Sequence, residues 1–374
     1  MAGIYIHIPF CRQKCHYCNF YSLASIKHRD EFLVALLKEI KLQKDYLGTE
    51  EVNTIYFGGG TPSLLSNEEL KRIFDALSNA FNINSAAEIT LEANPDDLDL
   101  AKLKELKNSA VNRLSIGIQS FRDQDLNYLN RIHSSQQARL SVLNAQHVGF
   151  DNISLDLIYG IPGMSDEDWQ SNLETFFSFD VPHLSAYALT VEPKTALDVL
   201  IRKKKMKPVD EQTIVSQFQL LVKKAIEKDF VHYEISNFCK VPFFSAHNKN
   251  YWFRQTYLGL GPSAHSFSGS TRQWNVSSVS KYSESIQKDK LPFESESLSI
   301  HQQYNEYVMT SLRTLWGADI DYILLTFGME TARHFQKFVN LYIKDGRIIQ
   351  KENIFTLSDY GKLFADGIAS ELFL

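Results

Sequence analysis

The sequence predicts an α/β protein built on a parallel sheet wrapped by helices, followed by a smaller C-terminal unit. Between residue 4 and about residue 230, short strands rich in Ile, Leu and Tyr alternate six times with amphipathic helices. Such alternation is typical of a parallel sheet that is either open or closed into a barrel. In both architectures, functional side chains collect at the carboxyl ends of the strands. A chain of 374 residues accommodates one large domain and a smaller one.

Six strands are expected, and they are Ile4–Pro9, Thr54–Phe57, Glu88–Glu92, Arg113–Gln119, Ile153–Tyr159 and Leu184–Thr190. Between them, apolar residues recur at helical spacing, most clearly in Arg29–Tyr46 and Glu68–Phe81. The basic run Arg202–Lys207 is interpreted as a solvated linker before a helix that begins near Asp210. The serine-rich stretch Ser266–Ser285 is predicted to be a loop.

Three of the four cysteines, Cys11, Cys15 and Cys18, lie within eight residues just after the first strand. Three thiolates leave one position of a metal centre open, which suggests that a cofactor or substrate binds the metal there. The alternative is a structural zinc site with His16 or Cys239 as the fourth ligand.

Polar or glycine residues also follow several of the predicted strands. They are Gly58-Gly59-Gly60-Thr61 after the second strand, Glu92 at the end of the third, Gln119 at the end of the fourth, and Asp156 within the fifth. We expect them to meet near the cysteines, because parallel strands end at one edge of the sheet. A triple glycine allows a ligand to approach the backbone closely, although a tight turn would also explain it. For the two carboxylates, the alternative is a buried capping role.

Composition and charge narrow the class of protein. Hydrophobic residues make up 44% of the chain and charged residues 22%, as in ordinary soluble globular proteins. The net charge of −5 gives no reason to expect a nucleic-acid partner. We expect no transmembrane segment, since no apolar run is long enough, and no signal peptide. A cytoplasmic location is therefore expected, with clustered cysteines that bind metal rather than form disulfides.

The last part of the chain, from about residue 301, is predicted to contain three helices and a hairpin. The hairpin strands are Arg347–Gln350 and Ile354–Leu357, and Ser358 is expected to cap a final helix. This pattern resembles a winged-helix module. Residues 301–374 hold seven Lys and Arg against nine Asp and Glu. Duplex binding needs a basic face, so a protein-contact or lid role is expected instead.

The spacing Cys11-x3-Cys15-x2-Cys18, followed by Gly-Gly-Gly-Thr-Pro after the second strand, resembles the radical S-adenosylmethionine (SAM) superfamily. Four further segments resemble, in order, the oxygen-independent coproporphyrinogen III oxidase group, and they are Tyr5–Cys11, Arg113–Phe121, Asp156–Gly163 and Tyr187–Pro193. The resemblance covers nearly the whole chain. It implies a partial (β/α)6 barrel over residues 1–232, a connecting region over 233–300 and a winged-helix-like domain over 301–374.

The resemblance also implies a [4Fe–4S] cluster on Cys11, Cys15 and Cys18, with SAM on the open iron. Three cysteines would ligate three of the four irons, which agrees with the one open position that the cysteine spacing indicates. Thiolates are the usual ligands of iron–sulfur clusters. The SAM contacts carried over from the family are Tyr5, Tyr17, Gly59, Gly60, Thr61 and Glu92. A second SAM-like pocket in the family maps to Gln119, Arg131, Asp156 and Ala188.

Two functions occur in this group. The coproporphyrinogen III dehydrogenases carry a fourth cysteine two residues after the third, where this chain has Phe20. The haem chaperones have Phe there and a His-Asn-x-x-Tyr-Trp motif, which is His247–Trp252 in this chain. The resemblance therefore implies a chaperone that binds haem and delivers it to an acceptor protein, with porphyrin oxidative decarboxylation as the alternative.

Within the motif, His247 would ligate haem iron while Tyr251 and Trp252 pack on the macrocycle. His265 and Cys239 are alternative ligands. Two further alternatives are a structural zinc protein and an RNA-modifying radical SAM enzyme. The sequence leaves open whether the chain is an enzyme, which protein accepts haem, and the oligomeric state, for which a homodimer is one arrangement it allows.

Overall fold

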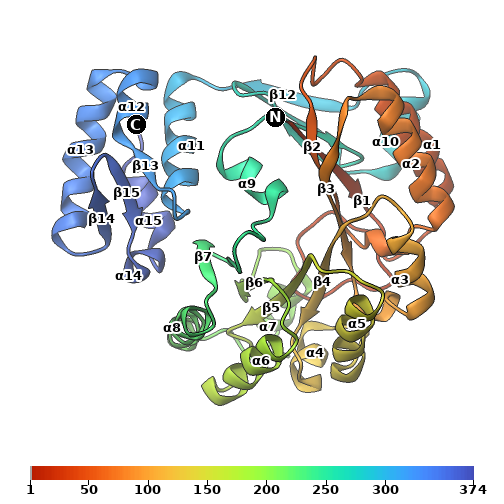
Figure 1. The fold of residues 1–374 in the computed structure, drawn as a ribbon, viewed down its shortest axis with the longest axis horizontal. Coiled ribbons are helices and arrows are strands. Elements are labelled where there is room, and N and C mark those ends of the chain that lie inside the picture. The colour runs from red at the N-terminus through yellow and green to blue at the C-terminus, as the bar shows by residue number, and fades with distance from the viewer. Residues whose placement is uncertain (1) are drawn as a thin grey trace.

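The computed structural model describes residues 2–374 and contains two hydrophobic cores. The first core runs from Ala2 to Ile286, and the second from Tyr304 to Leu372. Figure 1 shows the second unit, in blue, beside the larger first unit. Within residues 2–374, no helix has the length and apolar character needed to cross a bilayer. The division into three domains at residues 232 and 300 stays a prediction.

Six parallel strands form the centre of the first unit. In spatial and chain order they are β1 (Ala2–Ile8), β2 (Val52–Gly59), β3 (Ile83–Ala93), β4 (Arg113–Gln119), β5 (Ile153–Tyr159) and β6 (His183–Ala188). The predicted α/β class with a parallel sheet is confirmed. β3 is longer than predicted, and β6 ends two residues earlier. The central strands are almost entirely buried, as expected for a sheet with covered faces.

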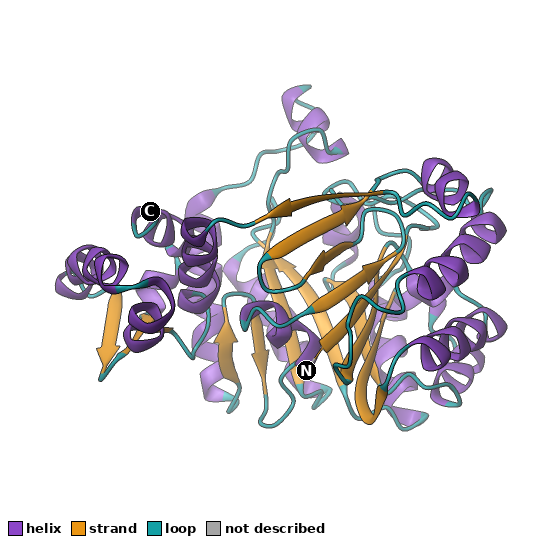
Figure 2. Ribbon diagram, turned by 90° about the horizontal axis from the view of Figure 1, so that it is seen from above, coloured by secondary structure: helices purple, strands orange, loops and turns teal. Residues whose placement is uncertain are grey.

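The sheet continues on both sides to a total of twelve strands. Beyond β6 lie the antiparallel strands β8 (Asn237–Cys239) and β7 (Val231–Glu234). Beyond β1 lie β9 (Tyr257–Leu260), which is parallel to β1, and then the antiparallel strands β10 (His265–Phe267), β11 (Thr271–Asn275) and β12 (Phe293–Ser297). Figure 2 shows the curved sheet with helices along its outer side.

The connecting helices carry their own start signals. Their bounds are α1 (Arg29–Leu42), α2 (Asn67–Ala80), α3 (Leu100–Lys107), α4 (Asp123–Leu129), α5 (Ser135–His147), α6 (Asp166–Ser178), α7 (Ala196–Arg202) and α8 (Glu211–Glu227), with short 3-10 turns η1 (Pro62–Leu64) and η2 (Pro95–Asp97). Ser66 and Glu69 form a capping box at α2. Asp210 caps α8, which begins near Asp210 as predicted. α1 stops at Leu42, four residues before the predicted end.

The prediction of a loop over Ser266–Ser285 is wrong. This stretch contains most of β10, all of β11 and most of α10 (Val279–Gln287). Its serines mask the apolar period, and one of them, Ser278, caps α10. Buried Tyr282 and Ile286 face α1, so tertiary packing outweighs the weak local signal.

A buried carboxylate fastens this region to α1. Glu39 is fully buried and accepts hydrogen bonds from the Gly261 amide (2.7 Å), the Asn275 side-chain amide (2.6 Å) and the Tyr282 hydroxyl (2.6 Å). Each donor comes from a different segment, namely the β9–β10 turn, β11 and α10. One side chain therefore sets the position of three segments.

The second unit contains the predicted helices and hairpin. Its elements are α11 (Ile300–Leu312), β13 (Ala318–Asp319), α12 (Ile320–Phe327), α13 (Met329–Lys344), β14 (Ile348–Lys351), β15 (Ile354–Leu357), α14 (Asp359–Lys362) and α15 (Ala365–Glu371). The strands form a three-stranded sheet in the order β13-β15-β14. Ser358 accepts the Gly361 amide and caps a helix as predicted, but this helix, α14, ends at Lys362 and the last helix is the separate α15.

Candidate functional site

The cysteine loop between β1 and α1 is anchored by side chains around the three thiols. Arg12 pairs with Asp97 at η2 (2.8 Å). Gln13 donates to the Asn130 carbonyl (3.0 Å), and His16 Nδ1 donates to the Tyr128 carbonyl (3.0 Å). The loop is therefore held against the carboxyl end of β3 and the end of α4 by the protein alone.

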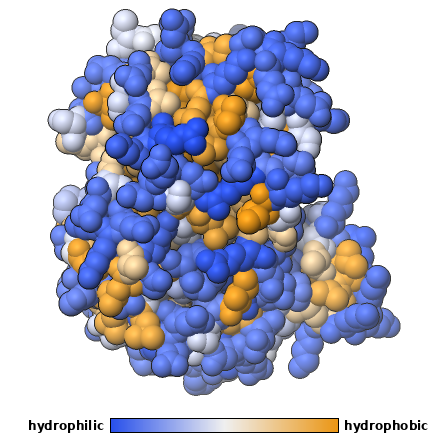
Figure 3. Space-filling view, turned by 90° about the vertical axis from the view of Figure 1, so that its right-hand side faces the viewer, coloured by the Kyte–Doolittle hydropathy of each residue, from blue (hydrophilic) through white to orange (hydrophobic). Residues whose placement is uncertain are grey.

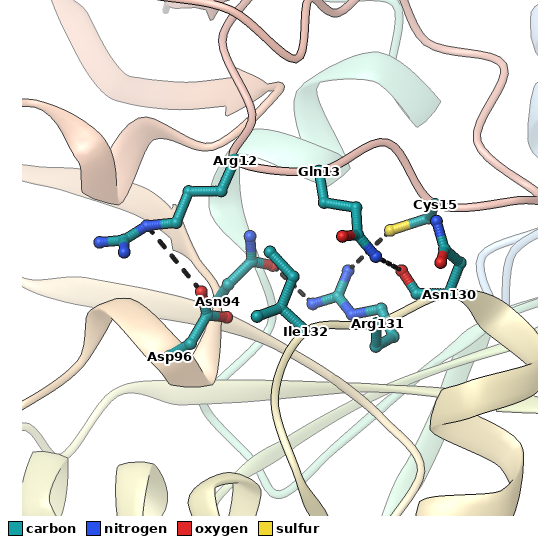
Figure 4. Close-up of a pocket in the computed structure, with 8 residues that line it drawn as sticks. All are labelled: Arg12, Gln13, Cys15, Asn94, Asp96, Asn130, Arg131 and Ile132. Carbon is teal, nitrogen blue, oxygen red and sulfur yellow. Dashed lines mark hydrogen bonds and ion pairs between the residues drawn. The ribbon is translucent and has the colours of Figure 1, made fainter.

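One cation stands directly beside the cysteines. Arg131 donates through Nη1 to Cys15 Sγ (3.3 Å) and through Nη2 to Asn94 Oδ1 (2.6 Å) and the Gly117 carbonyl (2.8 Å). Figure 4 shows this guanidinium reaching between the Cys15 sulfur and the Asn94 amide. A fixed positive charge favours a thiolate, which is the form that binds metals.

The donor set fits an iron–sulfur cluster better than a single ion. Cys11, Cys15 and Cys18 are free thiols, all half-buried. Burial raises the pKa of Cys11 and Cys18, and the charge of Arg131 opposes that rise at Cys11. In the part of the chain that the structure describes, no three His, Cys, Asp or Glu side chains converge to hold one ion. In a cubane each thiolate binds a different iron, so the sulfurs need not converge.

Neither alternative zinc ligand joins the cysteines. The Nδ1 atom of His16 is hydrogen-bonded to a carbonyl, and Cys239 is fully buried on β8, near the other end of the sheet. Burial raises the pKa of the Cys239 thiol to about 12, which disfavours the thiolate.

The glycines after β2 are required by close packing. A Cβ on Gly60 would lie 2.6 Å from the Ile8 carbonyl and 2.7 Å from the Phe10 carbonyl. The amides of Gly60 and Thr61 donate to these same carbonyls (2.8 and 2.7 Å). The Gly59 amide donates to Glu92 Oε2 (3.2 Å). These N–H groups are therefore used within the protein, and the glycines allow the cysteine loop to lie directly on the turn.

Glu92 forms the centre of the inner face of the sheet. Its Oε1 atom accepts the Tyr56 hydroxyl (2.8 Å). Burial raises the pKa of Glu92 to about 7, and the negative charge of Asp156 adds to the rise. Tyr5 stacks on Tyr56, with ring centroids 6.2 Å apart, and its hydroxyl donates to His7 Nδ1 (3.1 Å), since His7 Nε2 donates to the Tyr21 carbonyl (2.8 Å). Tyr5, Gly59, Gly60, Thr61 and Glu92 thus come together from β1, β2 and β3.

The residues of the predicted second pocket lie on the next strands. Gln119 ends β4 with a left-handed backbone (φ 65°), and half-buried Ala188 ends β6. Asp156 accepts from Ser115 (3.3 Å), and burial raises its pKa to about 6. Arg131 belongs to both groups, because it contacts Cys15 and also lies close enough to lower the pKa of Asp156. Tyr17, whose pKa is raised by burial, lies beside Arg131 and Cys15.

The His-Asn-x-x-Tyr-Trp motif forms the short helix α9 (Ala246–Trp252), on the inner side of the sheet against β1 and β2. His247 is 1% exposed. Its Nδ1 atom is hydrogen-bonded to the Thr54 hydroxyl (2.8 Å) and its Nε2 atom to the Tyr251 hydroxyl (2.9 Å). Burial lowers the pKa of His247 to about 3, so the ring is neutral. Trp252 is half-buried at the end of α9.

This motif lies at the amino ends of the strands, away from the cysteines. His247 lies next to Gly3 and Thr54, near the start of β1 and β2, whereas the cysteine loop follows their carboxyl ends. Glu88 accepts the amides of Ala246 and His247 (3.0 Å each) and holds the start of α9. The His247 ring nevertheless stacks on Tyr5 (ring centroids 6.5 Å apart) and on Tyr56 (5.1 Å), so the structure brings the predicted haem motif against one of the predicted SAM residues, Tyr5, although not against the cysteines.

Three residues of the site were not selected from the sequence. Tyr56 and Asn94 hydrogen-bond to predicted residues, and Arg113, buried beside Glu88, lowers the pKa of His247. Arg113 stood inside a segment that carried the family resemblance, and Asn94 followed the end of the third predicted strand. The positions of these residues on or next to predicted strands could have identified them. Their partners could not be identified from the sequence, because they lie on distant segments of the chain.

Comparison with known proteins agrees with the geometry. The radical SAM superfamily model matches residues 5–176. The heme chaperone HemW of Bacillus subtilis is 35% identical over 372 residues, which cover 98% of each chain. HemW of Mycobacterium tuberculosis strain H37Rv is 32% identical over 375 residues, which cover 99% of this chain and 94% of the relative.

A solved structure supports the fold. The coproporphyrinogen III oxidase HemN of Escherichia coli, a radical SAM enzyme, superimposes with a TM-score of 0.86 over 100% of this chain and 90% of HemN, at 22% identity. At that identity the likeness shows the fold alone, which is the predicted radical SAM architecture. Similarity over nearly the full length to several HemW proteins shows more: this chain belongs to the HemW family of the radical SAM superfamily.

Proposed function

We propose that this protein binds haem and transfers it to an acceptor protein, and that it carries a [4Fe–4S] cluster and SAM. The observation that carries the proposal is the similarity over 98% of both chains to a protein named as a heme chaperone. Haem is the cargo in this proposal. The cluster and SAM are resident groups of the barrel.

Phe20 separates this function from coproporphyrinogen III dehydrogenation. The dehydrogenases of the group have a cysteine at this position, and a phenyl ring cannot ligate iron. In this chain the Phe20 side chain is 64% exposed on the cysteine loop. Because the Phe20 ring buries little of its surface within this protein, it contributes little to holding the cysteine loop. It is available for contact with another molecule.

The resident groups have a defined set of candidate ligands. Cys11, Cys15 and Cys18 would hold three irons of the cluster, with Arg131 beside Cys15 to stabilise the thiolate. When bound, the cluster supplies an electron that can be passed to SAM. Glu92 presents a carboxylate of the kind that accepts hydrogen bonds from ribose hydroxyls, and it is already oriented by Tyr56 and Gly59.

The remaining SAM contacts are proposed on the same basis. We propose that Tyr5, Tyr17, Gly59, Gly60 and Thr61 would contact the first SAM molecule, and that Gln119, Arg131, Asp156 and Ala188 would form a second SAM-like site. All belong to β1–β6 or to the loops that follow them. Their convergence on one end of the sheet supports a SAM-binding role.

For haem, the proposed motif residues are His247, Tyr251 and Trp252. Ligation by His247 requires that its Nε2 atom lose its hydrogen bond with the Tyr251 hydroxyl and that α9 move away from β2. The proposal also includes a cytoplasmic location and no nucleic-acid partner. A homodimer is the oligomeric state to be tested, and analytical sedimentation would distinguish it from a monomer.

One reconstituted sample tests the proposal. After anaerobic reconstitution, the wild type should bind about four irons per chain and should give a Soret band with added haem. With SAM and a reductant, it should not convert coproporphyrinogen to protoporphyrinogen. Cys15→Ser should lose most of the iron, whereas Cys239→Ser, which changes a cysteine far from the loop, should retain it. Protoporphyrinogen formation, or an absence of haem binding, would overturn the proposal.

A further inference from the structure

We propose that Asn94 is a positioning residue of the cluster site, which directs two hydrogen-bond donors at the cysteines and thereby raises the reduction potential of the cluster. The two donors are the Arg131 guanidinium and the Thr61 hydroxyl. These three residues are called the Asn94 network below. The inference rests on the proposed cluster and assigns to a residue outside the cysteine loop a part in setting its chemistry.

The side-chain amide of Asn94 lies between the two donors. Its Oδ1 atom accepts from Arg131 Nη2 (2.6 Å), and its Nδ2 atom donates to Thr61 Oγ1 (3.1 Å). A guanidinium has only donors, so the amide oxygen must face Arg131 and the amide nitrogen must face Thr61. The orientation of the amide is therefore set by its two partners.

The Arg131 arm of the network ends at a cysteine sulfur. Nη2 donates one hydrogen to Asn94 and the other to the Gly117 carbonyl (2.8 Å), while Nη1 donates to Cys15 Sγ (3.3 Å). Figure 4 shows the guanidinium between the Asn94 amide and the Cys15 sulfur. Because a guanidinium is planar, two acceptors at Nη2 also determine the direction of the Nη1 donor.

The Thr61 arm ends at a second cysteine. Thr61 is 2% exposed, and its hydroxyl oxygen accepts from Asn94, which leaves the hydroxyl hydrogen for another acceptor. Burial raises the pKa of the Cys11 thiol, and a hydrogen bond from the Thr61 hydroxyl opposes that rise. One amide therefore orients one donor toward Cys11 and another toward Cys15.

The third cysteine does not depend on this network. Burial raises the pKa of the Cys18 thiol as well, and the hydrogen bond that opposes this rise comes from the backbone of Phe20. A change at Asn94 should therefore alter the surroundings of two of the three ligands without removing any ligand.

The backbone of Asn94 is held on both sides. Asn94 directly follows β3, and the next residue, Pro95, restricts it to an extended conformation (φ −97°, ψ 148°). Its carbonyl accepts the Asp97 amide (3.0 Å) at η2. A side chain on such a support keeps its direction before a cluster is bound.

Hydrogen bonds to the sulfurs are one determinant of the reduction potential of an iron–sulfur cluster. A cluster gains negative charge on reduction, so nearby donors and cations stabilise the reduced form. Solvent and salt weaken this effect for exposed charges. Figure 3 shows that hydrophilic side chains cover most of the face near α1 and α2. The Asn94 network, in contrast, is buried at Thr61 and half-buried at Asn94 and Arg131, so its effect should exceed that of exposed cations.

The test is a potentiometric titration of the reconstituted full chain, in which electron paramagnetic resonance measures the reduced cluster. In Asn94→Ala, we expect the ratio of reduced to oxidised cluster at a fixed potential to fall about tenfold, which corresponds to about 59 mV for one electron. This substitution changes no charge, so the shift would report the hydrogen bonds. As a control, Lys14→Gln removes an exposed cation near Cys18 and should change the ratio less.

A double-mutant cycle with Thr61→Val distinguishes positioning from a general loosening of the site. Because Asn94 acts partly through Thr61, the double variant should shift the potential by less than the sum of the two single variants. Iron analysis and circular dichroism check that each variant holds a cluster and is folded.

The outcomes separate this inference from the proposed function. If the wild type holds about four irons per chain and Asn94→Ala has the wild-type potential, or if the two single shifts simply add, the role of Asn94 is refuted while the cluster stands. If Asn94→Ala does not retain the cluster, a wild-type potential in Thr61→Val overturns the inference, and a lowered one supports it. If the wild type takes up no iron, the proposed function fails and this inference fails with it.

Discussion

The carboxylate of Glu39 should contribute more to stability than any exposed acid of the same helix. In Glu39→Ala, the Gly261 amide and the Tyr282 hydroxyl lose their acceptor in a fully buried place, and the Asn275 amide keeps only its hydrogen bond to the Gly261 carbonyl (2.9 Å). Each unsatisfied buried donor costs about 1–3 kcal/mol. Allowing for one water entering the space, we expect the free energy of unfolding to fall by about 3 kcal/mol or more. Urea unfolding followed by circular dichroism measures it.

Two comparisons make the result specific. Glu39→Gln keeps one acceptor oxygen, so it should cost about half as much. Glu31→Ala removes an exposed acid of α1 whose partner is His28 (3.1 Å), and it should cost about 0.5 kcal/mol or less. If Glu39→Ala and Glu31→Ala lowered the free energy of unfolding equally, the reasoning would be refuted. The buried hydrogen bonds of Glu39 would then not stabilise the protein more than an exposed ion pair does.

Two further predictions concern the barrel. Gly60→Ala should destabilise the protein by about 1–3 kcal/mol and reduce iron uptake, because its Cβ would collide with the backbone of Ile8 and Phe10. Gly367→Ala, in open space on α15, should be neutral or slightly stabilising, and thermal unfolding with iron analysis compares the two. Glu92 has a folded-state pKa of about 7, above its ordinary 4.5, so the folded state holds this proton more tightly than the unfolded state. The free energy of unfolding should therefore fall as pH rises from about 4.5 to about 7. Glu92→Gln should lose that part of the decline, and an identical pH profile in both proteins would contradict the shift.

The alternation of strands and helices was readable because each element carries a local signal. α2 has a capping box and a clear apolar stripe, and β4 is an apolar run between polar ends. Weakly patterned segments were misread. β11 and α10 are stabilised by burial against α1 and by Glu39, and neither contact leaves a trace in the local sequence.

For the candidate site, the spacing of Cys11, Cys15 and Cys18 identified the cysteine loop by itself, because ligands to one cluster can be close in sequence. Glu92 and Asp156 were found as polar residues on buried strands. Tyr56 and Asn94 were missed, since their importance comes only from partners on other strands.

The sequence by itself determined the fold class, the cysteine loop and the family of this protein, because these depend on local periodicity and short spacings. Only the tertiary structure decided how the candidate haem ligands are surrounded. His247 stands in the family motif but has both ring nitrogens engaged by Thr54 and Tyr251, whereas His265 is exposed beside Trp274. The availability of a side chain depends on what packs around it, and those contacts join residues far apart in the chain.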